Sequence, residues 1–119
     1  SRDSMKECLA ETLGSIFSMA DLKVELDGDY PAWQPNMKSE IVELMRKIYK
    51  ELFGNDNNVE VMHAGLECGI IGSKYPKMDM VSFGPTLRSP HTANERCHIP
   101  SVDKYWVFLK EILAQTPKK

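Results

Sequence analysis

The chain has 119 residues, a formal net charge of −2 and an apolar fraction of 42%. These values are typical of a globular protein with a modest core, and they show no basic excess of the kind that nucleic-acid-binding domains carry. The apolar runs are only a few residues long, far short of a membrane span, and no signal peptide is recognisable. The composition therefore predicts neither nucleic acid nor a membrane as a partner.

The three cysteines, Cys8, Cys68 and Cys97, are odd in number and lack C-x-x-C spacing. Such a set is a poor disulfide framework and favours a reducing, cytoplasmic setting. Ser1 is not a natural initiator residue, so we expect the chain to be cut from a longer one.

The first predicted element is a helix over residues 5–19. Ser4 and Glu7 match the S-x-x-E capping box, in which a side chain and the backbone satisfy each other's free donors. Helical spacing places one apolar face on this helix, formed by Met5, Leu9, Leu13, Ile16 and Ala20.

A half-buried strand is predicted over residues 22–26, where apolar and polar residues alternate. The sequence Asp-Gly-Asp at 27–29 supplies a turn, and residues 30–35, with two prolines, indicate an extended connector. We expect a domain boundary in this connector.

A second helix is predicted to begin after Ser39 as N-cap and to end before Gly54, which can adopt the left-handed conformation of a C′ residue. Its wide apolar stripe consists of Ile41, Leu44, Met45, Ile48, Leu52 and Phe53.

The remaining elements are a strand over 59–63, a short helix over 65–71, a strand over 78–83, and a loop over 86–100 before a last helix. Ser101 is the predicted cap of that helix, and its core-facing residues are Val102, Tyr105, Trp106, Leu109, Ile112 and Leu113. Strands that alternate with helices predict an α/β fold with parallel strands and right-handed crossovers.

The strongest candidate for chemistry is His91, in the long loop after a predicted buried strand. Imidazole is a common zinc ligand, although a loop histidine is more often solvated or structural. The second candidate is the segment 63–69, where a strand leads through glycine into a helix whose backbone N–H groups suit an anionic ligand. A simple tight turn between strand and helix is the commoner explanation of that spacing.

Two weaker sites stay open. A zinc site from Cys68, Cys97, His91 and His98 lacks the paired cysteine spacing that usually anchors such sites. Cys68 as a nucleophile activated by His63 or His91 competes with the commoner role of cysteine as a small buried residue.

The motifs HAGLECG at 63–69 and MDMVSFGPT at 78–86, together with His91 and Glu95, closely resemble the C-terminal part of the aminoacyl-histidine dipeptidases. These enzymes are also called Xaa-His or cytosol non-specific dipeptidases, and they belong to a clan of two-zinc exopeptidases. The resemblance begins before the connector and continues to the last helix.

The resemblance implies that residues 1–33 are the last helix and strand of a ferredoxin-like α+β lid domain. Residues 34–119 would be the C-terminal part of the α/β catalytic domain, with His91 as a zinc ligand and Gly65 as a substrate-binding backbone position. The other ligands of the two metal ions and the general base would lie upstream, so no catalytic residue is expected here and the fragment alone should be inactive. The implied partners are a dipeptide substrate, the rest of the parent chain and, as an option, a second copy in a homodimer.

The family usually reads H-S-P-D-E where this chain has His91, Thr92, Ala93, Asn94 and Glu95. Loss of a proline and a carboxylate predicts a looser loop and weaker metal binding, since carboxylates often orient ligating histidines. The alternatives are a self-sufficient, non-catalytic α/β binding or assembly domain and another peptidase of the same clan, such as a tripeptidase.

Overall fold

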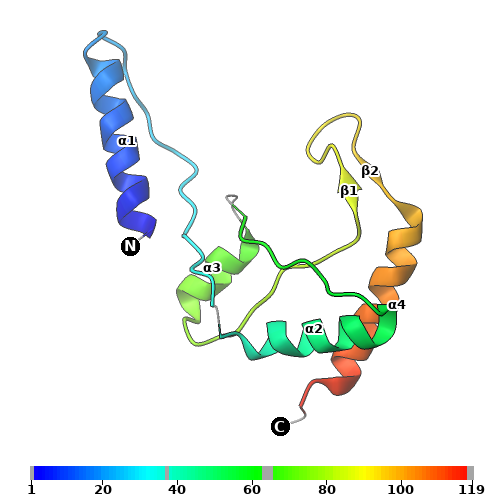
Figure 1. The fold of residues 1–119 in the computed structure, drawn as a ribbon. Helices are drawn as coiled ribbons and strands as arrows, with labels where there is room; N and C mark the ends of the chain where they lie inside the picture. Colours follow the sequence, from blue (N-terminus) through cyan, green and yellow to red (C-terminus); the bar gives the residue numbers. More distant parts are fainter. Residues whose placement is uncertain (1, 37, 63–65, 118–119) are drawn as a thin grey trace. The chain divides into compact units, whose positions relative to one another are not determined.

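The computed structural model describes residues 2–36, 38–62 and 66–117, which are mainly helical (Figure 1). Its elements are α1 (Arg2–Ser18), α2 (Glu40–Phe53), α3 (Glu67–Lys74), β1 (Leu87–Arg88), β2 (Arg96–Cys97) and α4 (Ile99–Gln115). Two compact units are formed, one by residues 1–36 with 61–78 and one by 37–60 with 79–119. None of the helices in the described ranges is long and apolar enough to cross a membrane.

The prediction of parallel strands is wrong for the described residues. Segments 22–26, 59–62 and 78–83 have no strand pairing, and the sheet that is described is an antiparallel pair in which Leu87 faces Cys97 and Arg88 faces Arg96. An alternating or apolar segment becomes a strand only when a neighbouring strand accepts its backbone hydrogen bonds. The predicted hydrophobic pattern is present, but no partner for it lies in the described ranges.

The core of the second unit lies between α2 and α4. Its buried side chains are Met45, Ile48, Phe108 and Ile112, and Ile41, Leu44, Tyr49, Phe53 and Val81 pack around them. Phe108 is the centre of an aromatic cluster, with ring centroids 5.3 Å from Tyr49, 5.7 Å from Phe83 and 6.4 Å from Phe53. Five of the six residues of the predicted α2 stripe lie in or against this core, and the sixth, Leu52, is 38% exposed. A clear amphipathic period leaves little choice of face.

The inward face of α4 was predicted in part. Ile112 is buried as expected, but Phe108 was missed, and Trp106 and Leu113 are 56% and 66% exposed. Apolar residues surround much of this helix, so periodicity alone did not select the side that meets α2. The contact with the α2 stripe selects it.

Both predicted caps of α2 are confirmed. The Ser39 hydroxyl oxygen accepts a hydrogen bond from the Val42 N–H at 3.2 Å, and Gly54 has φ +72° and donates its N–H to the Lys50 carbonyl at 2.9 Å. Asp79 adds a contact that the sequence did not predict. Its Oδ2 accepts from the Ser39 hydroxyl at 2.9 Å and from the Ile41 N–H at 3.2 Å. The start of α2 is therefore tied to the segment that carries Val81 into the core.

Replacing Asp79 with alanine is expected to lower the free energy of unfolding by about 1–2 kcal/mol, the usual cost of losing a helix cap. The substitution removes the carboxylate oxygen that accepts hydrogen bonds from the Ser39 hydroxyl and the Ile41 N–H at the start of α2. Urea unfolding followed by circular dichroism measures the change. Asp79→Asn keeps a side-chain oxygen acceptor and should recover most of the loss; equal losses in both variants would contradict this account.

The predicted first helix is confirmed, but it begins at Arg2, so the capping role given to Ser4 is wrong. Its predicted core face is exposed: Met5 is 73%, Leu9 60%, Leu13 45% and Ile16 56% accessible. Leu9, Leu13 and Phe17 line a shallow groove whose other side is Val24 and Leu26. The face is apolar as predicted, and Val24 and Leu26 of the extended segment lie beside part of it.

The other helix starts were predicted less well. Helix α3 runs two to three residues later than the expected 65–71, and α4 begins at Ile99 with His98 in the N-cap position, so Ser101 is not the cap. The Ser101 hydroxyl instead donates to the His98 carbonyl at 2.6 Å and accepts from the Thr86 N–H at 2.9 Å. This side chain thus joins the first turn of α4 to the residue just before β1.

Candidate functional site

His91 lies in the loop between β1 and β2, which the sequence had predicted only as an irregular segment (Figure 1). The residue is exposed, and its backbone has φ +62°. Ser89 in the same loop has φ +51°. Left-handed backbone is uncommon for residues other than glycine, so the loop has a specific and mildly strained shape.

Hydrogen bonds within the loop hold this shape. The Glu95 Oε2 accepts the His91 N–H at 3.0 Å, and the Glu95 N–H donates to the Thr92 carbonyl at 3.1 Å. The Thr92 hydroxyl donates to the Ser89 carbonyl at 2.9 Å and accepts the Asn94 N–H at 3.2 Å. Thr92, which departs from the family pattern, therefore supplies contacts of its own. The looser loop and the weaker metal binding expected from Asn94 stay predictions.

The donor set at His91 is suited to a metal ion only in part. An exposed imidazole on a fixed loop can provide one nitrogen ligand. However, across residues 2–36, 38–62 and 66–117 no three histidine, cysteine, aspartate or glutamate side chains gather to hold a metal ion. The four-residue zinc site considered above is therefore not formed by the described residues. His91 fits the role of one ligand whose companions come from elsewhere.

The second candidate segment is described only from Leu66 onward. His63, Ala64 and Gly65 lie outside the described residues, so the substrate-binding role of Gly65 stays a prediction. Leu66 is extended at the start of α3, Cys68 is half-buried, and Gly69 is buried.

Gly69 has a packing role that the motif did not reveal. A Cβ atom built on Gly69 would lie 2.4 Å from the Pro31 carbonyl oxygen and 3.8 Å from the Tyr30 ring. Only a residue without a side chain lets the connector backbone approach α3 so closely.

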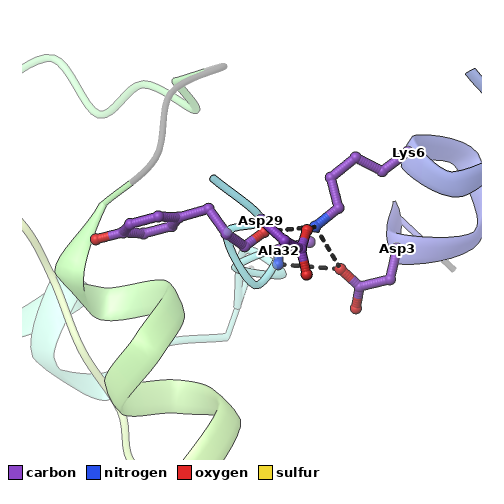
Figure 2. A network of polar contacts seen from close by, with 5 residues as sticks. Asp3, Lys6, Asp29 and Ala32 are labelled. Atoms are coloured by element: carbon purple, nitrogen blue, oxygen red, sulfur yellow. Dashed lines mark hydrogen bonds and ion pairs between the residues drawn. The ribbon is translucent and has the colours of Figure 1, made fainter. Parts of the chain in front are cut away.

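A polar cluster joins the same connector to the first turns of α1 (Figure 2). Lys6 Nζ donates to Asp29 Oδ1 and to the Tyr30 carbonyl, each at 2.6 Å, and lies 3.7 Å from Asp3 Oδ1. Asp3 Oδ1 in turn accepts the Ala32 N–H at 3.1 Å. Except for Asp3 and Lys6, which lie three residues apart on α1, the partners are more than twenty residues apart, so the sequence pattern gave no signal for their contacts.

The cluster shifts two pKa values. The hydrogen bond from Lys6, reinforced by its positive charge, lowers the pKa of Asp29 below its ordinary 3.8. The same hydrogen bond raises the pKa of Lys6 above its ordinary 10.5, against a smaller opposing effect of desolvation. Because the pKa of Asp29 is lowered, the ion pair is lost only when the pH falls through that lowered pKa. Because the pKa of Lys6 is raised, the ion pair is also lost when the pH rises through that raised pKa. The contact is therefore complete throughout the neutral range.

Lys6→Met is expected to return the pKa of Asp29 towards its ordinary value, because the donor and the nearby charge disappear together. Carboxyl carbon shifts followed by NMR during an acid titration measure this pKa. Lys23→Met is the matched control, since Lys23 pairs with Glu25 instead. An Asp29 pKa unchanged by Lys6→Met would show that the ion pair does not form in solution.

Residues 5–115 match the model of peptidase family M20/M25/M40. The chain belongs to this family. The chain is also 44% identical, over 117 residues, to the cytosol non-specific dipeptidase of Escherichia coli (strain K12). That alignment covers 98% of this chain but only 24% of the relative, so the chain spans about a quarter of the relative's length. Peptidases of family M20/M25/M40 are typically metal-dependent.

Proposed function

We propose that this chain is the C-terminal part of a zinc-dependent dipeptidase that hydrolyses Xaa-His and other dipeptides. The observation that carries the proposal is the 44% identity to a cytosol non-specific dipeptidase over almost the whole chain. We further propose a cytoplasmic location, in keeping with the relative's name, and a parent protein able to form a homodimer.

In this proposal residues 1–33 form the last helix and strand of the lid domain. Residues 34–119 form the C-terminal part of the catalytic domain. Two features of the structure support it. The apolar face of α1 is exposed where a lid sheet would cover it, and segments 22–26, 59–62 and 78–83 have no strand partner among residues 2–36, 38–62 and 66–117. Exposed apolar faces and unpaired extended segments are expected where the rest of a core is missing.

His91 is the proposed zinc ligand, and Gly65 is the proposed backbone contact for the substrate. The metal ions, two in the parent enzyme, would activate a water molecule for attack on the peptide bond. His91 contributes to this by fixing the position of one ion. The remaining ligands and the general base would come from the rest of the parent chain, so this part alone is expected to be inactive.

The experiment is a hydrolysis assay of the metal-stripped full-length protein with an Xaa-His dipeptide, with and without added Zn²⁺. The 119-residue chain and a histidine-containing tripeptide are run in parallel. Zinc-dependent cleavage of the dipeptide by the full-length protein alone supports the proposal. Preferred cleavage of the tripeptide would favour a tripeptidase. Failure of the full-length protein on both substrates would favour the non-catalytic binding or assembly domain.

A further inference from the structure

We infer that Glu95 is a positioning residue for metal binding: its carboxylate holds the His91 backbone in the left-handed conformation that aims the imidazole. The inference rests on the proposed role of His91 as a ligand and extends it to Glu95, whose carboxylate accepts the His91 N–H.

The backbone of His91 requires a restraint. With φ +62° it occupies a region that residues with a Cβ atom seldom adopt, and its side chain is exposed, so core packing does not hold it there. A loop free to relax would turn the Cα–Cβ bond of His91 in another direction. An imidazole that must meet a metal held by distant residues depends on that direction.

Glu95 supplies the restraint from four residues further along the chain. Its Oε2 accepts the His91 N–H at 3.0 Å while its own N–H donates to the Thr92 carbonyl at 3.1 Å. The two bonds close a small ring around residues 91–95, just before β2. Because Oε2 is engaged by the His91 N–H, the carboxylate acts on the loop backbone in this structure.

The test compares Glu95→Ala and Glu95→Gln in the full-length protein. Alanine removes the acceptor, whereas glutamine keeps an amide oxygen at the same distance along the side chain but is a poor metal ligand. Two quantities are measured: Zn²⁺ affinity by titration of the stripped protein, and amide hydrogen exchange of residues 89–95 by mass spectrometry without metal. We expect Glu95→Ala to weaken Zn²⁺ binding about 10-fold and to speed exchange, and Glu95→Gln to restore both nearly to wild type.

The outcomes separate this inference from the function proposed above. Unchanged exchange in Glu95→Ala, or faster exchange with unchanged Zn²⁺ affinity, overturns the positioning role and leaves His91 as a ligand. Weak binding in both variants also overturns it, since it would make the carboxylate itself a ligand. If the His91→Ala variant binds Zn²⁺ as tightly as the wild type, the assignment of His91 as a ligand is wrong. That conclusion holds whatever the amide hydrogen exchange of Glu95→Ala shows.

Discussion

His91→Ala in the full-length protein is expected to lose one zinc ion and to reduce dipeptide turnover by more than about 100-fold. Changing a residue that only supports a ligand typically costs about 10–100-fold in affinity or activity, so removing the ligand itself should cost more. Bound zinc is counted by elemental analysis after dialysis, and turnover is measured at saturating metal. Both values should fall together.

His98→Ala is the matched control for this experiment. His98 is also an exposed histidine, close to β2, and its hydrogen bonds to Thr86 and Ser101 are made by its backbone, which alanine preserves. Its metal content and turnover should stay near those of wild type. If the two variants behave alike, or if His91→Ala keeps normal activity, the assignment of His91 is wrong.

Ile48→Ala is expected to lower the free energy of unfolding by about 2–5 kcal/mol, the largest effect on stability predicted for this chain. Ile48 is fully buried between α2 and α4, against the cluster around Phe108 and Ile112. Truncation removes buried methyl groups and leaves a cavity that two packed helices can close only in part.

The control for Ile48 is Ile99→Ala, the same chemical change at a side chain that is 77% exposed. Its effect should lie within about 0.5 kcal/mol, because little apolar surface returns to water. Urea unfolding of the 119-residue chain, followed by circular dichroism, measures both. Comparable losses in the two variants would show that α2 and α4 do not pack as described.

Local signals predicted the ends of α2 correctly, whereas the caps predicted at Ser4 and Ser101 are wrong because α1 and α4 begin earlier in the chain. The caps at Ser39 and Gly54 need only neighbouring residues to define them, and both are confirmed. The apolar stripe of α2 is confirmed except at Leu52, which is exposed. Signals that depend on a distant partner were predicted poorly. The alternating pattern at 22–26 specifies a strand only if another strand lies beside it, and the apolar residues of α4 do not reveal that Phe108 is the one that meets α2.

For the candidate site, the motifs of the sequence predicted the family, which the comparisons confirm, whereas the role of His91 as a metal ligand stays a proposal. The tertiary structure decided the conformation of His91, the hydrogen bond that its N–H donates to Glu95, the approach of Pro31 to Gly69 and the cluster of Lys6 with Asp29. Each of these depends on where the backbone turns and on which atoms then come within about 3 Å, the range of a hydrogen bond. The sequence pattern shows which groups are able to interact. The folded structure determines which of those groups come close enough to do so.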